Sequence, residues 1–167
     1  MRLLELGCGL GFPSLALALS HPNNLFVTMS DQEPLVSLME ENIRLNGIDE
    51  TKARAIPLDW DNEDHLSSLL SSSSTIDNNS SSSNPNPTLS SSSSPFGPPF
   101  DFIIASDVVY EPLYGESWRD FVKVVKTISS SSPNLKIILA SGYLFLLLFL
   151  VDFSLQISLS FQSFTII

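Results

Sequence analysis

Cysteine and basic residues are scarce in this chain. Of its 167 residues one is cysteine, and eight lysines and arginines stand against 18 aspartates and glutamates, giving a formal net charge of −10. A single cysteine forms no intrachain disulfide, and the chain does not start with the basic and apolar segments of a secretory signal. We therefore expect a cytoplasmic protein, with the nucleus as the alternative location. Without clustered cations we expect no nucleic-acid partner, whereas an acidic surface suits a basic protein.

Potential metal ligands are also few. His21 and His65 lie far apart in polar, loop-like surroundings, and Cys8 lies alone between two glycines. A protein metal site needs several such side chains close together. We therefore expect no metal site, and we interpret Cys8 as a small packing residue, with a nucleophile as the alternative.

The clearest motif lies at the start of the chain. The apolar run 3–6 predicts a buried strand, Gly7, Gly9 and Gly11 follow at alternate positions, and 13–19 predicts a helix. Glycine leaves room for a ligand on the backbone and adopts conformations that other residues avoid. A strand, a bare loop and a helix start together predict a nucleotide-binding loop.

The spacing distinguishes two kinds of nucleotide. A dinucleotide fingerprint, G-x-G-x-x-G, needs glycine at position 12, where this chain has Phe12. Glu5 precedes the first glycine, and its carboxylate would repel a pyrophosphate but could accept hydrogen bonds from the ammonium group of an amino acid. The motif therefore favours a nucleotide ligand with an amino-acid end.

Strand and helix patterns alternate along the rest of the chain. Apolar runs predict further strands, and amphipathic or capped stretches predict helices between them; the strands are 25–29, 53–58, 102–105 and 136–141, and the helices 32–46 and 117–128. Such alternation is typical of a parallel sheet covered on both faces. We predict a Rossmann-like, doubly wound α/β fold with a mainly parallel sheet of about five strands.

Two acidic residues follow predicted strands at positions suited to a nucleoside. Asp31 lies 20 residues after Gly11, close to where α/β nucleotide folds place an acid for the ribose hydroxyls. Its alternative role is to cap the helix that begins after it. Asp59 could accept the adenine amino group and Trp60 could form a wall for the ring, although Trp60 could equally fill the core.

The fully apolar strand 102–105 is followed by Asp107 and Tyr110. In open α/β sheets, ligands and chemistry lie at the carboxyl ends of the central strands. Asp107 and Tyr110 are therefore the candidates for the reaction centre.

These residues together resemble the seven-β-strand (class I) S-adenosylmethionine-dependent protein-lysine methyltransferases of the methyltransferase-like group. The resemblance covers residue 3 to about residue 143, and its most specific parts are Leu-Asp-Trp at 58–60 and Asp-Val-Val-Tyr at 107–110. It implies S-adenosyl-L-methionine as cofactor, held by Glu5, Gly7, Gly9, Gly11, Asp31, Asp59, Trp60 and Asp107. Enzymes that methylate adenine or glutamine usually have an Asn-Pro-Pro-Tyr motif after the fourth strand. This chain has Ser-Asp-Val-Val at 106–109 instead, which disfavours those substrates.

The resemblance also implies the reaction. The product would be a methylated lysine in a non-histone protein such as a chaperone or a translation factor. Asp107 would lie near the methionine part of the cofactor and Tyr110 near the incoming amine, with a capping aromatic at a strand end as the alternative role for Tyr110. A small-molecule methyltransferase would share the same cofactor pocket.

Composition divides the chain into four parts. Residues 1–66 and 100–143 form two halves of a methyltransferase domain, and the Ser-, Asn- and Pro-rich stretch 67–99 predicts a disordered insertion. Residues 144–167 form a hydrophobic tail in place of the family's last two strands. The family's segment before the first strand is also missing, so a catalytically inactive, truncated fragment that binds cofactor or a protein partner is the alternative function.

The tail is the one candidate for a membrane segment. Between Lys136 and Asp152 lie 15 uncharged residues, which as a helix would reach about 22 Å against a hydrocarbon core of about 30 Å. Membrane spanning is therefore disfavoured. Because 16 of the 24 tail residues are Leu, Phe, Ile or Val, residues that uracil-rich codons encode, we interpret the tail as the translation of an unspliced intron.

Overall fold

The computed structural model describes residues 1–72, 94–108 and 115–140. Tyr110, the tail 144–167 and the central part of the predicted insertion lie outside the described residues.

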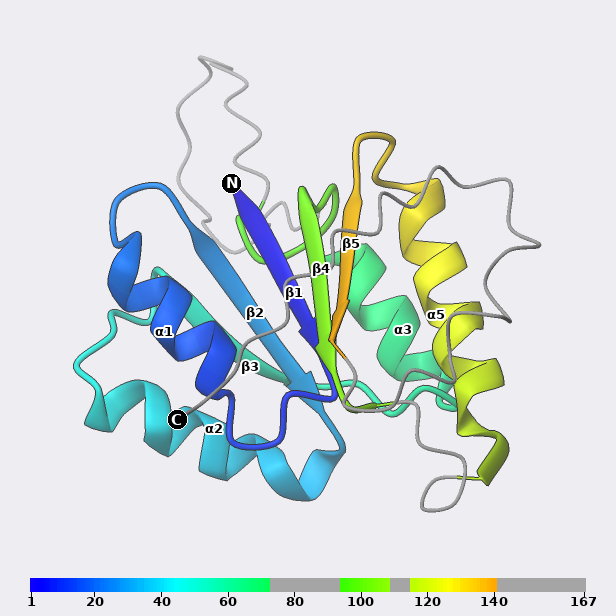
Figure 1. Ribbon diagram of the computed structural model, residues 1–167, viewed down its shortest axis with the longest axis horizontal. Coiled ribbons are helices and arrows are strands. Elements are labelled where there is room, and N and C mark those ends of the chain that lie inside the picture. Colours follow the sequence, from blue (N-terminus) through cyan, green and yellow to red (C-terminus); the bar gives the residue numbers. More distant parts are fainter. Residues whose placement is uncertain (73–93, 109–114, 141–167) are drawn as a thin grey trace, which may run out of the picture.

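Five strands form one parallel sheet in the order β3-β2-β1-β4-β5 (Figure 1). The strands are β1 (Arg2–Leu6), β2 (Phe26–Asp31), β3 (Ala53–Pro57), β4 (Phe102–Ser106) and β5 (Lys136–Ala140). Each neighbouring pair is parallel and in continuous register. The predicted Rossmann-like α/β fold and the number of strands are confirmed.

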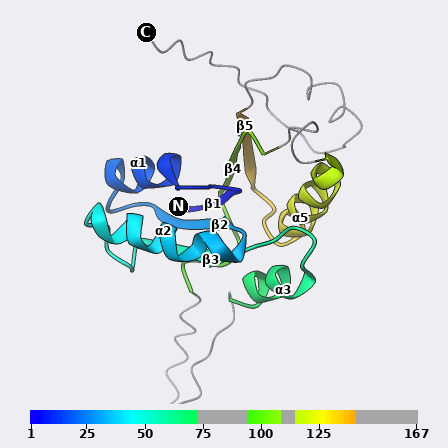
Figure 2. The ribbon, with the colours of Figure 1, turned by 90° about the horizontal axis from the view of Figure 1, so that it is seen from below.

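Helices cover the sheet on both faces. They are α1 (Phe12–Ser20), α2 (Glu33–Leu45), α3 (Glu63–Ser71), the short 3-10 helix η1 (Gly115–Ser117) and α5 (Trp118–Ser130). Figure 2 shows the sheet on edge, with α1 and α2 on one side and α3 and α5 on the other. This arrangement is the doubly wound form that alternating strands and helices predict.

The apolar run of β1 serves both faces, because successive side chains of a strand point to opposite sides. Leu4 packs in the core beneath α3 and α5, whereas Leu3 packs in the core beneath α1 and α2. In α5 the buried residues Phe121, Val124 and Ile128 recur at helical spacing. Burial on both sides explains why β1 is apolar throughout.

Both ends of the predicted insertion 67–99 lie within the described residues. Residues 67–71 belong to α3, and residues 94–99 pack at the amino end of the sheet. There the Thr28 hydroxyl donates a hydrogen bond to the Phe96 carbonyl over 3.0 Å, and the Phe96 ring meets the Phe26 ring edge to face. Residues just inside the predicted boundaries 67 and 99 therefore pack against the rest of the fold, because apolar and aromatic residues among the serines find partners there.

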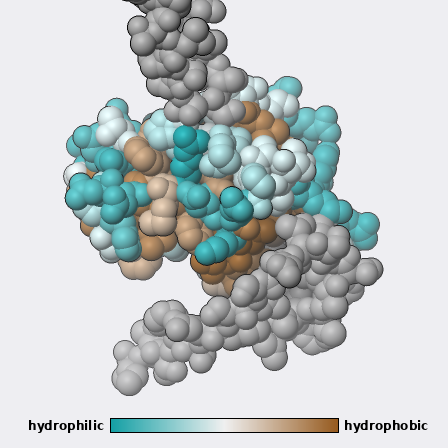
Figure 3. Space-filling view, turned by 90° about the horizontal axis from the view of Figure 1, so that it is seen from above, coloured by the Kyte–Doolittle hydropathy of each residue, from teal (hydrophilic) through white to brown (hydrophobic). Residues whose placement is uncertain are grey.

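Part of one sheet face has no cover among the described residues. On the side of α1 and α2, Ile138 of β5 is 54% exposed, and Phe102 and Ile104 of β4 are only partly buried. Figure 3 shows apolar areas on the surface of the molecule, bordered by polar side chains.

Candidate functional site

Four of the five strands bring predicted site residues to one edge of the sheet. Gly7 follows β1, Asp31 ends β2, Asp59 follows β3 and Asp107 follows β4. Leu6 of β1 is paired with Ser30 of β2, so the glycine loop begins beside Asp31. The chain leaves β1 toward β2 on one side, and β4 lies on the other, which makes this edge the topological switch point where α/β sheets bind ligands.

The glycine loop is a tight turn held by backbone hydrogen bonds. The Gly11 N–H donates to the Cys8 carbonyl over 2.8 Å, and the Cys8 N–H donates to the Ser30 carbonyl of β2 over 3.1 Å. Gly7, Gly9 and Gly11 all have positive φ, between 55° and 77°. The loop therefore depends on backbone conformations that side chains disfavour.

Two of these glycines differ in what surrounds them. A Cβ on Gly7 would lie 2.6 Å from Cγ1 of Val108 and 3.3 Å from the Trp60 ring, whereas a Cβ on Gly9 would meet nothing within 4 Å. Gly7 is thus needed for packing between β1 and β4. Gly9 faces open space, so the loop offers bare backbone there to a ligand.

Glu5 is buried behind the loop, with 2% of its surface exposed. Its Oε2 accepts the Ser14 N–H in the first turn of α1 over 3.1 Å, and that helix has no cap from the side chain of its own N-cap residue, Gly11. A carboxylate near a helix N-terminus satisfies a backbone donor and complements the helix dipole. Glu5 therefore holds α1 against the sheet; its contact with a cofactor ammonium stays a prediction.

Burial raises the pKa of the Glu5 carboxyl; hydrogen bonds from Ser14 oppose this, and the charge of Asp31 adds to it. A raised pKa in the folded state stabilises the fold below the carboxyl's unfolded value near 4.5, and that contribution is lost as the pH rises through the folded pKa. As the pH rises from 4 to 8, we expect the Tm of Glu5→Gln to rise relative to that of the wild type by a few degrees. Thermal unfolding of both chains across this range tests it, and a difference in Tm that stays constant with pH would contradict it.

Asp31 joins β2 to the glycine loop. Its Oδ2 accepts the Gly9 N–H over 2.7 Å, and its Oδ1 accepts the Gln32 N–H over 2.7 Å. The N-cap residue of α2 is Gln32, and no side chain makes the capping bond. The N-cap residue is therefore Gln32 and not Asp31, whose carboxylate links the start of α2 to the glycine loop. Ribose binding by Asp31 stays a prediction.

Helix α2 supports the loop from the other side. The Asn42 amide donates to the Leu10 carbonyl over 3.0 Å, and the Cys8 thiol lies against the Met39 thioether. Cys8 is buried, and burial raises the pKa of its thiol. A thiol that stays protonated is a poor nucleophile, which agrees with a packing role for Cys8.

Trp60 lies between the glycine loop and α5. Its ring meets the Phe121 ring edge to face with centroids 5.2 Å apart, and it would touch a Cβ on Gly7 at 3.3 Å. The side chain is only partly buried on the core beneath α3 and α5. Trp60 thus packs on the core, as the alternative proposed, and its role as a wall for adenine stays a prediction.

Asp107 has a left-handed backbone conformation, with φ 53°. Its N–H donates to the Ala140 carbonyl of β5 over 2.9 Å, and the next residue, Val108, packs against Gly7. A non-glycine residue at positive φ is uncommon, and such residues gather at functional sites. Tyr110, the other candidate for the reaction centre, lies outside the described residues.

Two further kinds of site were sought in the described part of the chain. Within residues 1–72, 94–108 and 115–140, no three His, Cys, Asp or Glu side chains form a group that could hold a metal ion. No helix in these ranges combines the length and apolar character needed to cross a membrane.

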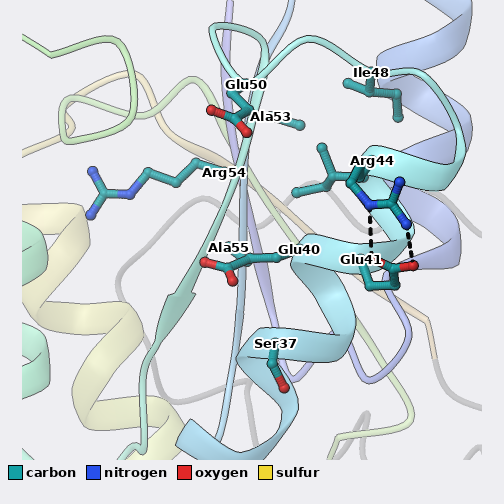
Figure 4. A pocket seen from close by; sticks show the side chains of 10 residues that line it. Ser37, Glu40, Glu41, Arg44, Ile48, Glu50, Ala53, Arg54 and Ala55 are labelled. Carbon is teal, nitrogen blue, oxygen red and sulfur yellow. Dashed lines mark hydrogen bonds and ion pairs between the residues drawn. The ribbon is translucent and has the colours of Figure 1, made fainter.

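A hollow of about 720 Å³ lies between α2 and β3, away from the predicted site residues (Figure 4). Its lining mixes charged and apolar side chains and includes Arg44 and Glu41, which form an ion pair along α2. None of the predicted cofactor residues lines this hollow. The candidate site is therefore the loop at the strand ends.

The chain resembles known methyltransferases in sequence and in structure. Residues 1–77 match the model of a family described as Lysine methyltransferase. Among solved structures, the mitomycin 7-O-methyltransferase MmcR has 13% identity and a TM-score of 0.52, with 84% of this chain and 30% of that chain covered. The SAH-bound methyltransferase PaMTH1 of Podospora anserina has 15% identity and a TM-score of 0.51, with 83% and 44% covered.

At these identities the structural matches establish the fold alone, a Rossmann-like α/β fold that both methyltransferases share. This chain spans less than half of the length of either structure. The curated protein sequences contain no significant match. The family match covers the part of the chain that carries the glycine loop, Asp31, Asp59 and Trp60.

Proposed function

We propose that this chain is an S-adenosylmethionine-dependent methyltransferase that acts on lysine in a non-histone protein. One observation carries the proposal: a glycine loop with open space at Gly9 lies beside the Asp31 carboxylate at the switch point of the sheet. The match of residues 1–77 to a lysine methyltransferase family supports the reaction class.

The residues fit the cofactor by their chemistry. The bare backbone around Gly9 leaves room for the methionine part, and the Asp31 carboxylate has acceptor sites left for ribose hydroxyls after its two backbone bonds. The partly buried Trp60 ring would cover one face of the adenine, and Asp59 would accept its amino group. The related fold of PaMTH1 is SAH-bound, which agrees with this assignment.

When bound, S-adenosylmethionine supplies a methyl group on a sulfonium sulfur, ready for transfer. The incoming lysine amine must be neutral, and its pKa in water is about 10.4, so the site has to select the deprotonated form and align it with the methyl carbon. Asp107 lies at the carboxyl end of β4, the strand next to the glycine loop. Its carboxylate would supply negative charge that favours a cationic sulfonium.

A basic protein suits this chain as substrate, because its formal net charge is −10. Opposite charges speed the encounter between two proteins. Chaperones and translation factors remain the classes that the family resemblance suggests.

Calorimetry with S-adenosylmethionine and a methyl-transfer assay test the proposal in two steps. We expect binding, followed by transfer of labelled methyl from the cofactor to lysines of a cell lysate, identified by amino-acid analysis. Binding without transfer would favour the inactive fragment, and transfer to small metabolites alone would favour a small-molecule enzyme. Absence of binding at millimolar cofactor would overturn the proposal.

Asp107→Asn separates the charge of this residue from its backbone conformation. Asparagine tolerates positive φ about as well as aspartate, so the turn after β4 should persist and Tm should change little. We expect methyl transfer to fall at least tenfold, about 1.4 kcal/mol in barrier height. Unchanged transfer in this variant would remove Asp107 from the reaction centre.

A further inference from the structure

His65 is bonded to the loop that carries Asp59 and Trp60. It lies in the first turn of α3, and its Nδ1 accepts the Asp59 N–H over 3.1 Å. The Asn62 N–H donates to the Asp59 carbonyl over 3.0 Å. Both backbone polar groups of Asp59 are thus held by α3 and the residue that caps it.

The same short segment fixes its own helix start. Oδ1 of Asn62 accepts the N–H groups of Asp64 and His65, over 3.0 and 3.3 Å. Asn62 therefore anchors α3, and α3 presents the His65 ring to Asp59. These hydrogen bonds link Asp59, Asn62 and His65 to one another.

These hydrogen bonds position residues next to the candidate cofactor site. The Leu58 N–H donates to the Asp31 carbonyl over 2.8 Å, so the loop begins beside Asp31. Trp60, the next residue after Asp59, lies over Gly7 and against Phe121. A shift of Asp59 would move the Trp60 ring and the proposed adenine contacts together.

The bond to Asp59 depends on the protonation state of the imidazole. A ring nitrogen accepts a hydrogen bond only in the neutral form, because both nitrogens of the cationic form are donors. Nδ1 as acceptor therefore places the single proton on Nε2. Histidine is the side chain whose charge changes between pH 5 and pH 8.

The charged groups near His65 are mainly acidic. Asp59 and Asp61 belong to the loop, Glu63 and Asp64 to α3, and Lys123 of α5 pairs with Glu63 over 2.8 Å. In the cationic form of the ring both nitrogens are donors, so the bond to the Asp59 N–H is lost.

We propose that His65 is a positioning residue of the cofactor site, whose Nδ1 holds the Asp59–Trp60 loop in the conformation that binds the adenine, so that cofactor affinity falls when the ring becomes cationic. The inference rests on the proposed function, since it assigns the adenine to this loop. It adds a residue that touches neither cofactor nor substrate and makes the affinity dependent on pH.

Three variants test the inference by calorimetry with S-adenosylmethionine at pH 8 and pH 5. In His65→Asn the side-chain oxygen takes the place of Nδ1 and accepts without titrating, whereas His65→Ala has no acceptor. At pH 8 we expect His65→Ala to bind about tenfold more weakly and His65→Asn to bind like the wild type. At pH 5 the wild type should approach His65→Ala, while His65→Asn keeps its affinity.

His21→Ala is the matched control, because the chain has only two histidines and His21 is exposed at the end of α1. It should follow the wild type at both values of pH. The inference is overturned if His65→Ala binds like the wild type at pH 8, or if His65→Asn loses as much affinity at pH 5 as the wild type does.

A second measurement needs no cofactor. In a Trp118→Phe background Trp60 is the one remaining tryptophan, and its fluorescence reports the position of the loop. We expect the emission to shift between pH 8 and pH 5 in the His65 chain and to stay constant with Asn at this position. If the emission shifts as expected but no variant binds S-adenosylmethionine, His65 positions the loop and the proposed function fails. If the emission changes neither with pH nor with the substitution, the inference is overturned.

Discussion

Gly9→Ala is expected to lower the affinity for S-adenosylmethionine at least 100-fold, about 2.7 kcal/mol, while the chain stays folded. The added methyl group meets no protein atom within 4 Å, so it disturbs no packing. It projects instead into the space that we assign to the cofactor. The cost to the fold is limited to the positive φ of 55°, about 1–2 kcal/mol for a residue with a Cβ. Calorimetry and thermal unfolding measure the two effects separately.

Gly47→Ala is the matched control for this substitution. Gly47 ends α2 with φ 64°, and a Cβ there also meets nothing within 4 Å. The two variants therefore carry similar backbone strain in open surroundings, and their Tm values should fall by similar amounts. Only Gly9→Ala should lose the cofactor. Equal affinity in the two variants would show that the open space at Gly9 is not the binding site.

Asp31→Ala is the second substitution with a large expected effect. Hydrogen bonds from two ribose hydroxyls to a carboxylate contribute about 1.5–3 kcal/mol each, although not additively, so we expect affinity to fall at least 100-fold. The variant also frees the N–H groups of Gly9 and Gln32, which Asp31 holds at 2.7 Å each. Some loss of stability should therefore accompany the loss of binding. Glu33→Ala, which removes the same charge two residues later, should bind normally.

A change in the ligand isolates the contact between Asp31 and ribose from its structural role. The 2′,3′-dideoxy analogue of S-adenosylhomocysteine lacks both hydroxyls. The wild type should bind it far more weakly than S-adenosylhomocysteine, whereas Asp31→Ala should bind both about equally, since the partner of the hydroxyls is gone. If the variant discriminates between the two ligands as strongly as the wild type, Asp31 does not bind ribose.

Local patterns in the sequence were enough to predict the five strands and the helices α1, α2 and α5, but not α3. The run of β1 is apolar because the strand is buried on two faces, and the spacing of α5 is amphipathic because the helix is buried on one face. The glycine after α2 supplies a positive φ. After α2 the Ile48 N–H donates to the Ile43 carbonyl and the Gly47 N–H to the Arg44 carbonyl, as in a Schellman motif.

Contacts between distant residues were beyond these patterns. The role of His65 was missed because no local sequence pattern reveals that its ring faces the Asp59 N–H. The one available signal was Asn62, a good cap that predicts a helix start and so turns position 65 back toward the loop. The cap role of Glu5 for α1 was missed for the same reason, since it joins a strand to a helix across the glycine loop.

The sequence by itself determined the α/β class, the glycine loop and the order of acidic residues after successive strands, because these follow from hydrophobic periodicity and from the conformational freedom of glycine. The tertiary structure alone decided which side chains serve the loop and which face open space. Asp31 turned from α2 to the Gly9 N–H, and Gly7 proved closed where Gly9 is open. The physical reason is that the pairing of the strands brings residues far apart in the sequence together. Only this pairing decides which backbone N–H groups, such as that of Gly9, are hydrogen-bonded within the protein.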